Sequence, residues 1–376
     1  MKKILVVDDS ALMRRVVFDI INSDEKLQAE RYAVNGLEAL EILKSGEKFD
    51  AIVLDINMPK MNGIELLREM KKQGMNETVL IVSTLAKEGA KETIQALELG
   101  AFDFVTKPDS LAEAKGPSFS NRLINMLRTA TNLPTVLSSD DEKIEQSVAG
   151  KSSKNVTKER TSLQKKLLKG DVSKHSKAPL GGSARKLVAL ACSTGGPKAL
   201  QYVIPFLPAN LDAAVLIVQH MPEGFTASLS SRLDELSRVN VQEAAHGVIL
   251  EKGTVYIAKG GSQMRLVEKG KKEHSLSVTV EAARNGLKPC ADIMYESLMK
   301  TSFDEITCVV MTGMGADGTK GILQLEQTNK IYVIAQDEES STVYGMPKAI
   351  ADAGAVDEVV PLKKIADAIT KHVGVR

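Results

Sequence analysis

Residues 188–200 read VALACSTGGPKAL. A short apolar run ends at Cys192 and is followed by Ser193, a threonine, two glycines and a proline. This order predicts a buried strand, a tight turn and the start of a helix, because glycine suits the turn and proline suits the first helical position. The turn alone allows three interpretations: a simple connection, an anion-binding helix N-terminus, or a serine nucleophile at the end of a strand.

The same change from apolar run to amphipathic segment recurs through the first 110 residues. The apolar runs are apolar on both faces, which predicts a doubly wound parallel sheet of five strands with helices on both sides. We expect strands at 4–8, 29–34, 51–56, 78–83 and 101–108, and helices at 11–22, 36–44, 63–72, 87–99 and 118–130.

A second alternating unit runs from residue 186 to residue 376. It predicts an α/β domain whose sheet is mostly parallel with a few antiparallel strands, and residues 253–267 have hairpin character. We expect its strands at 187–191, 213–219, 254–258, 275–280, 306–312 and 330–336.

The segment between the two units has a different composition. No aromatic residue occurs between Phe119 and Tyr202, and Ser, Lys, Thr and Gly dominate residues 151–186. Such a segment buries too little apolar surface to fold alone. We therefore predict three parts: a first domain at 1–132, a flexible linker at 133–185 and a second domain at 186–376.

Composition excludes several classes of function. The 376-residue chain has a formal net charge of +1, which gives no reason to expect nucleic acid as a partner. Its three cysteines are scattered without metal-ligand spacing, as in a reduced cytoplasmic protein. No run of about 18 apolar residues is present, so we expect no membrane-spanning segment. A cytoplasmic protein is therefore predicted.

Charged side chains end several strands of the first unit. Asp8 and Asp9 end the first, Asp55 the third and Lys107 the fifth, while Ser83 ends the fourth. In a doubly wound sheet these strand ends meet at one edge, where ligands bind. Converging carboxylates repel one another unless a cation such as Mg²⁺ lies between them. The set favours phosphoryl transfer onto Asp55, although helix capping by Asp9 and Ser10 remains an alternative for those two residues.

Residues 1–130 resemble response-regulator receiver domains through these residues and the stretch VLDINMPKMNG. The resemblance implies a flavodoxin-like fold and Mg²⁺-dependent phosphorylation of Asp55 by a chemotaxis sensor histidine kinase. It also implies metal ligands and switch residues; the ligands would be Asp8, Asp9, Asp55 and the Asn57 carbonyl, and the switch residues Ser83, Phe104 and Lys107.

The second unit also ends strands on reactive residues. Ser193 needs a base within hydrogen-bond reach to act as a nucleophile. Of the five histidines, only His220 directly follows a predicted buried strand, and Asp317 lies in the glycine-rich turn after another. A core histidine and a turn aspartate are the alternatives for the single residues, but together the three favour a catalytic triad. The order Ser, His, Asp and the absence of a G-x-S-x-G elbow argue against an α/β-hydrolase.

The second unit resembles the catalytic domain of the chemotaxis methylesterases, the CheB family. The matching stretches are STGGP at 193–197, VQHMPEGFT at 218–226, VYIAKGG at 255–261, TGMGADG at 312–318 and AQDEESSTVYGMPKAI at 335–350. The resemblance implies Ser193 as nucleophile, His220 as general base and Asp317 as the carboxylate that orients it. The Met314 N–H and the Thr194 region would form the oxyanion hole. Cys192 departs from the family pattern, where a small residue is more usual, and so does Lys259.

The resemblance implies a phosphorylation-activated hydrolase of glutamate methyl esters on chemoreceptors, in which the unphosphorylated receiver covers the Ser193 edge. Deamidation of receptor glutamines by the same triad is a further activity of some family members. We expect no cofactor for the hydrolase, a monomer peripheral to receptor arrays, and no binding of nucleic acid. The competing hypothesis is a binding module whose Ser-Thr-Gly-Gly turn holds an anion without turnover.

Overall fold

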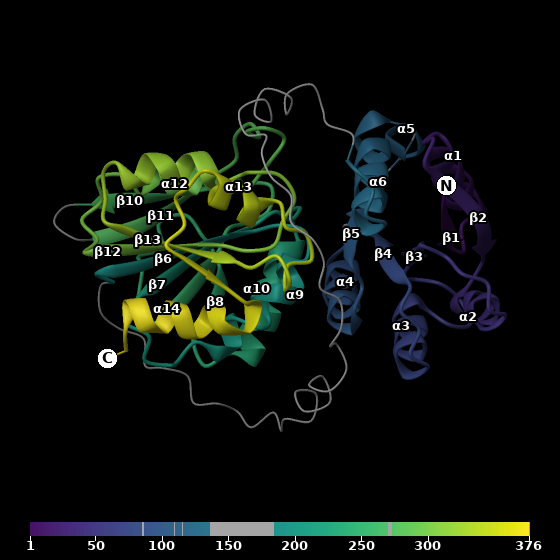
Figure 1. The fold of residues 1–376 in the computed structure, drawn as a ribbon, viewed down its shortest axis with the longest axis horizontal. Coiled ribbons are helices and arrows are strands. Elements are labelled where there is room, and N and C mark those ends of the chain that lie inside the picture. Colours follow the sequence, from purple (N-terminus) through teal and green to yellow (C-terminus); the bar gives the residue numbers. More distant parts are fainter. Residues whose placement is uncertain (85, 109, 115, 136–183, 270–272, 376) are drawn as a thin grey trace.

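The computed structural model describes residues 1–84, 86–108, 110–114, 116–135, 184–269 and 273–375. These residues form two separate α/β units, each built on a parallel sheet (Figure 1). The predicted linker at 133–185 lies outside the described residues except at its two ends, so its conformation and the domain boundaries stay predictions.

The first unit is the expected five-stranded sheet, in the order β2-β1-β3-β4-β5 with every neighbouring pair parallel. Its side chains alternate between two apolar clusters: Leu5 and Val7 face one, and Ile4 and Val6 face the other. The strands are β1 (Lys2–Val7), β2 (Leu27–Ala33), β3 (Ala51–Asp55), β4 (Thr78–Ser83) and β5 (Asp103–Thr106).

Helices cover both faces of this sheet. Ser10, Asn35 and Asn62 each cap a helix by accepting a backbone N–H, which explains why the helices begin where they do. The helices are α1 (Ala11–Asn22), α2 (Gly36–Lys44), α3 (Gly63–Lys72), α4 (Lys87–Leu99), α5 (Leu111–Ala114) and α6 (Pro117–Ala130). Of these, only the one-turn α5 was not predicted from the sequence.

The second unit contains a seven-stranded sheet in the order β14-β13-β12-β6-β7-β9-β8. The strand that precedes Ser193, β6, lies at its centre between β12 and β7, so the turn after it sits in the middle of the sheet edge. The strands are β6 (Lys186–Cys192), β7 (Ala214–Gln219), β8 (Asn240–Glu243), β9 (Thr254–Ile257), β12 (Glu305–Val310), β13 (Ile331–Gln336) and β14 (Glu358–Val360).

Two apolar clusters lie on opposite faces of this sheet, because alternate residues of β6 belong to different clusters. Helices α9, α10 and α14 pack on one face, and α11, α12 and α13 on the other. Their bounds are α9 (Gly196–Leu200), α10 (Phe225–Leu236), α11 (Ala291–Ser297), α12 (Thr319–Glu326), α13 (Met346–Asp352) and α14 (Ile365–Val373), with 3-10 turns η1 (Ile204–Phe206) and η2 (Leu362–Lys364).

The antiparallel part differs from the sequence prediction. All strand pairs of the seven-stranded sheet are parallel among the described residues. The hairpin is a separate two-stranded sheet of β10 (Gln263–Lys269) and β11 (Glu273–Thr279), one strand later than expected. Met264, Leu266 and Leu276 are buried in an apolar cluster of the domain, so the hairpin packs on the domain rather than extending its sheet.

Candidate active site and its receiver

The acids of the first unit meet at the carboxyl ends of its strands. The Nζ atom of Lys107 lies 2.8 Å from Oδ2 of Asp8 and 2.8 Å from Oδ2 of Asp55. One carboxylate oxygen from each of Asp8, Asp9 and Asp55 lies within 4.8 Å of the others. Burial raises the pKa of Asp55, and the charge of Lys107 opposes that rise.

This cluster fits a divalent cation by its chemistry. It presents three carboxylates, two of them buried, and oxygen is the donor that Mg²⁺ prefers. Asn57 follows Asp55 by two residues and is exposed in the loop after β3. Burial lowers the pKa of Lys107, but the two carboxylates outweigh it and leave the pKa raised, so the ammonium stays charged.

Ser83 and Phe104, two of the three predicted switch residues, lie in different surroundings. Ser83 is buried at the end of β4, where its hydroxyl accepts a 2.8 Å hydrogen bond from the Thr93 hydroxyl. Phe104 is buried in β5 and stacks on Phe225 of α10, with ring centroids 4.6 Å apart. Phe104 therefore links the first unit to the second.

In the second unit, strand register brings Ser193 and His220 together. Cys192 pairs with Gln219 across β6 and β7, so the next residue on each strand lies at the same edge. The His220 N–H donates to the Cys192 carbonyl at 3.2 Å, and the Ser193 N–H donates to the Thr312 carbonyl at 3.0 Å. Three neighbouring strands thus end at the Ser193 turn.

Several positions around Ser193 require glycine, because the backbone conformation or a close neighbouring atom excludes a side chain. Gly195 has a φ of 77°, a conformation that side chains other than glycine rarely adopt. A Cβ atom on Gly196 would lie 2.0 Å from Oε1 of Gln219, and one on Gly313 would lie 2.8 Å from Cβ of Ser193. The backbone approaches so closely at this edge that no larger residue fits.

His220 and Asp317 form a largely buried pair. Nε2 of His220 lies 2.8 Å from Oδ2 of Asp317, and their side chains are 10% and 6% exposed. The Asp317 carboxylate also accepts the N–H groups of Ala291 at 2.6 Å and Asp292 at 3.0 Å. Burial alone would raise the pKa of Asp317, but the bond to His220, its charge and these N–H groups lower the pKa to about 2.

The remaining predicted residues lie beside the turn. Thr194 is buried, and its carbonyl accepts a 3.0 Å hydrogen bond from the Thr312 hydroxyl. In the part of the chain that the structure describes, the Met314 N–H makes no hydrogen bond, which leaves it free to bind an anion. Lys259 follows β9 by two residues.

One residue that connects the strand ends at this edge, Gln219, was not predicted from the sequence. Gln219 is buried, and its Nε2 donates to the carbonyls of Ser193 at 3.1 Å and His220 at 3.3 Å. Its Oε1 accepts the Cys192 thiol at 3.0 Å, so Cys192 is a hydrogen-bond donor as well as a small buried residue. A polar residue that ends an otherwise apolar strand was the available signal.

The first unit is docked on the Ser193 edge of the second. One cluster of buried apolar side chains runs from α4 and β5 into α9 and α10. Arg232 of α10 binds Glu98 of α4 through two hydrogen bonds of 2.6 and 3.3 Å. The Thr129 hydroxyl of α6 lies 3.7 Å from Sδ of Met314, so the first unit covers the turn that carries Met314.

An acid of the receiver faces the Ser193 turn directly. Asp103, at the start of β5, is buried, and burial raises its pKa to about 6. The Thr194 side chain and the Gly195 N–H, among other groups, oppose that rise by stabilising the charged carboxylate. The turn after β6 therefore interacts with a carboxylate in the docked state.

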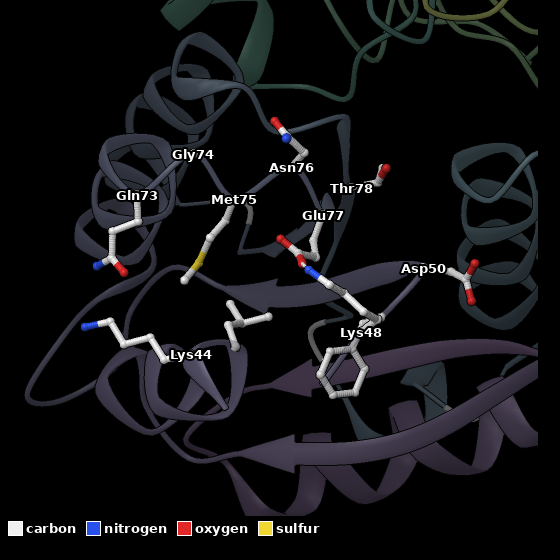
Figure 2. Close-up of a pocket in the computed structure, with 11 residues that line it drawn as sticks. Lys44, Lys48, Asp50, Gln73, Gly74, Met75, Asn76, Glu77 and Thr78 are labelled. Carbon is white, nitrogen blue, oxygen red and sulfur yellow. Dashed lines mark ion pairs between the residues drawn. The ribbon is translucent and has the colours of Figure 1, made fainter. Parts of the chain in front are cut away.

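A groove elsewhere has no connection with this chemistry. It is lined by residues such as Lys44, Lys48, Gln73 and Glu77 and lies at the amino-terminal ends of β3 and β4 (Figure 2). Asp55 and Ser83 end the same strands on the opposite edge of the sheet. Lys48 and Glu77, two of the residues that line it, form a 3.8 Å ion pair.

Comparison with known proteins decides the family. Residues 188–369 match the family model of the CheB methylesterase, and residues 4–115 match that of the response regulator receiver domain. Protein-glutamate methylesterase/protein-glutamine glutaminase 1 of Syntrophomonas wolfei is 40% identical over 372 residues, covering 98% of both chains. The chain belongs to the protein-glutamate methylesterase family. The methylesterase/glutaminase of Bacillus subtilis is 38% identical and covers 99% of each chain.

A solved structure also resembles this methylesterase-family chain. The Thermotoga maritima CheB methylesterase catalytic domain is 36% identical, with a TM-score of 0.48, and covers 51% of this chain and 100% of its own. Among the described residues, no helix has the length and apolar character needed to cross a bilayer.

Proposed function

We propose that this chain is a phosphorylation-activated protein-glutamate methylesterase that hydrolyses glutamate γ-methyl esters on the cytoplasmic helices of chemoreceptors. The single observation that carries the proposal is the largely buried His220–Asp317 pair beside Ser193, in a chain of this family. Glutamine side chains of the receptors are a second substrate for the same acyl chemistry. The protein acts in the cytoplasm, at the periphery of receptor arrays.

The reaction begins with Ser193. Its Oγ attacks the ester carbonyl carbon while His220 takes the hydroxyl proton. Because Nε2 of His220 is bonded to Asp317, the atom that takes this proton is Nδ1. The oxyanion is stabilised by the unpaired Met314 N–H and the Thr194 region.

Collapse of the tetrahedral intermediate breaks the bond to the methoxy oxygen, which receives the proton from His220 and leaves as methanol. The glutamyl group is then esterified to Ser193. Water attacks this ester, gives its proton to His220 and releases the free glutamate carboxylate, and the proton returns to the serine oxygen. The low pKa of Asp317 keeps it ionised, so it stabilises the imidazolium in both halves of the reaction.

In the receiver, the carboxylate of Asp55 attacks the phosphorus of a phosphohistidine on the sensor kinase, so that a P–O bond to Asp55 forms as the P–N bond to the histidine breaks. Asp8, Asp9 and Asp55, with the Asn57 carbonyl, would hold Mg²⁺, which neutralises charge on the phosphoryl oxygens when bound. Lys107 already bonds Asp8 and Asp55, so it is placed to bind a phosphoryl oxygen on Asp55. Phosphorylation then breaks the contacts of Lys107 with Asp8 and Asp55 and moves Ser83. These changes loosen the contact between Phe104 and the second unit.

Methanol release from methyl-labelled receptor membranes tests the proposal. We expect release by the full chain to rise at least severalfold when Mg²⁺ and a small phosphodonor are added. Asp55→Asn should remove that rise, because a carboxamide cannot accept the phosphoryl group. The matched control is Asp50→Asn, which changes an aspartate at the opposite edge of the same sheet that pairs with Lys2. Equal activation of Asp55→Asn and wild type, or no release in any condition, would contradict the proposal.

The docked interface gives a second prediction. Arg232→Glu should raise the activity of the unphosphorylated protein about three- to tenfold. The substitution replaces the two hydrogen bonds to Glu98 by repulsion between two carboxylates. We expect it to destabilise the docked arrangement by about 1 kcal/mol. Glu98→Arg should act alike, and the double charge exchange should restore low activity. Arg185→Glu is the control, since Arg185 pairs with Asp304 away from the receiver. Unchanged basal activity in both single variants would show that this pair does not hold the gate.

A further inference from the structure

Two buried aspartates hold the starts of each other's helices. The Asp317 carboxylate, in the turn before α12, accepts the N–H groups of Ala291 and Asp292 at the start of α11. In return, Oδ1 of Asp292 accepts the N–H groups of Gly318 at 3.0 Å and Gly321 at 2.8 Å at the start of α12. The two helices are therefore joined by four hydrogen bonds between carboxylates and backbone.

The close approach of the two helices depends on Gly321. A Cβ atom there would lie 2.8 Å from Cβ of Tyr295 and 3.0 Å from Cα of Asp292. Tyr295 is fully buried, and its hydroxyl donates to the Ala189 carbonyl of β6. The α11 helix is thus fixed to the strand that leads to Ser193.

Two buried carboxylates side by side would ordinarily repel each other. Here each lies at a helix N-terminus, where backbone N–H groups and the positive end of the helix dipole favour negative charge. Asp317 has two further donors, His220 and the Cys290 thiol at 3.1 Å. Among the described residues, Asp292 makes no hydrogen bond or ion pair with His220 or Ser193, so it acts only through the backbone around Asp317.

We propose that Asp292 is a positioning residue, which fixes the turn at 316–318 and so holds Oδ2 of Asp317 against Nε2 of His220. This inference rests on the proposed function and adds a residue to its machinery. It predicts that kcat depends more on the hydrogen-bond acceptor at position 292 than on its negative charge, because the acceptor oxygen binds the two N–H groups at the start of α12.

Three variants of the full chain separate an acceptor from a charge. Asp292→Asn keeps an oxygen at the same distance without the charge, whereas Asp292→Glu keeps the charge but moves the oxygen by one methylene. Asp292→Ala removes both. We expect kcat within about threefold of wild type for the Asn variant and a fall of about 10- to 100-fold for the Glu and Ala variants. KM should change by less than about twofold, because Asp292 does not touch the substrate.

The opposite order, with the Glu variant active and the Asn variant impaired, would overturn the inference, as would a wild-type kcat for the Ala variant or a change confined to KM. If the Ala variant fails to fold, the order of the Asn and Glu variants still decides. Asp357→Ala is the control, since Asp357 also accepts a backbone N–H, that of Val333 at 2.7 Å, but it lies directly before the edge strand β14. Its kcat should equal that of wild type.

A second readout keeps this test separate from the proposed function. The rate at which a serine-reactive phosphonate labels Ser193 depends on the triad and requires no receptor. We expect labelling to follow the same order, wild type and Asn variant above Glu and Ala variants. If wild type is labelled but releases no methanol, the proposed function fails while the labelling order still tests the role of Asp292. Equal labelling of all four proteins would overturn the inference even where methanol release is normal.

Discussion

The Ser193→Ala variant should release methanol from methylated receptors at least about 10³-fold more slowly than wild type, with or without phosphodonor. The Ser193 hydroxyl supplies the protein atom that bonds to the substrate carbon in the first half of the proposed reaction. The fold should survive, because Ser193 contributes its backbone N–H and carbonyl to the turn, and alanine retains both. Thermal unfolding should therefore differ little from that of wild type.

The chain provides a matched control in a second serine–histidine pair. The Ser302 hydroxyl lies 3.3 Å from Nε2 of His274, outside the Ser193 edge. Ser302→Ala should leave methanol release unchanged, because Ser302 precedes β12, whereas Ser193, His220 and Asp317 follow the carboxyl ends of their strands. Retention of function by Ser193→Ala would identify the second unit as a binding module in which the turn holds an anion without turnover.

The receiver shows how far strand order can be read from sequence. Asp8, Asp55 and Lys107 lie far apart in the chain, yet each follows a buried run that a parallel sheet must place side by side. By the same reasoning, the sequence predicts Ser193 and His220 at one edge of the second unit. In the structure, the register of β6 and β7 places them in adjacent positions at that edge. Parallel topology constrains strand ends strongly, so residues at those ends are the easiest to predict.

Other features had no comparable signal. The hairpin of β10 and β11 was misplaced because its apolar residues resemble those of the parallel strands, and only tertiary packing separates it from the main sheet. From the sequence, Asp292 is an ordinary acidic residue in the first turn of a helix. Nothing in the sequence indicates that its side chain binds the start of a second helix, α12. Phe225 and Arg232 lie on an amphipathic helix, and nothing in its spacing shows that one face meets the receiver.

Asp317→Asn should lower methanol release by about 10³- to 10⁴-fold while leaving the nucleophile in place. The ionised carboxylate can only accept, so it fixes the proton on Nε2 of His220 and leaves Nδ1 free to take the serine proton. A carboxamide can instead donate to Nε2, which moves the ring proton to Nδ1 and blocks the base. The charge that stabilises the imidazolium is lost as well.

The same carboxylate makes a pH-dependent contribution to stability. Burial would raise its pKa, but His220 and the backbone N–H groups lower it from 3.8 to about 2 in the folded state. A depressed pKa stabilises the fold above pH 3.8, and that stabilisation is lost as the pH falls from 3.8 through 2. The difference in unfolding free energy between wild type and Asp317→Asn should therefore narrow over that range, as measured by denaturant titration at each pH. A gap that stays constant as the pH falls from 4 to 2 would mean that the Asp317 charge contributes nothing to the fold.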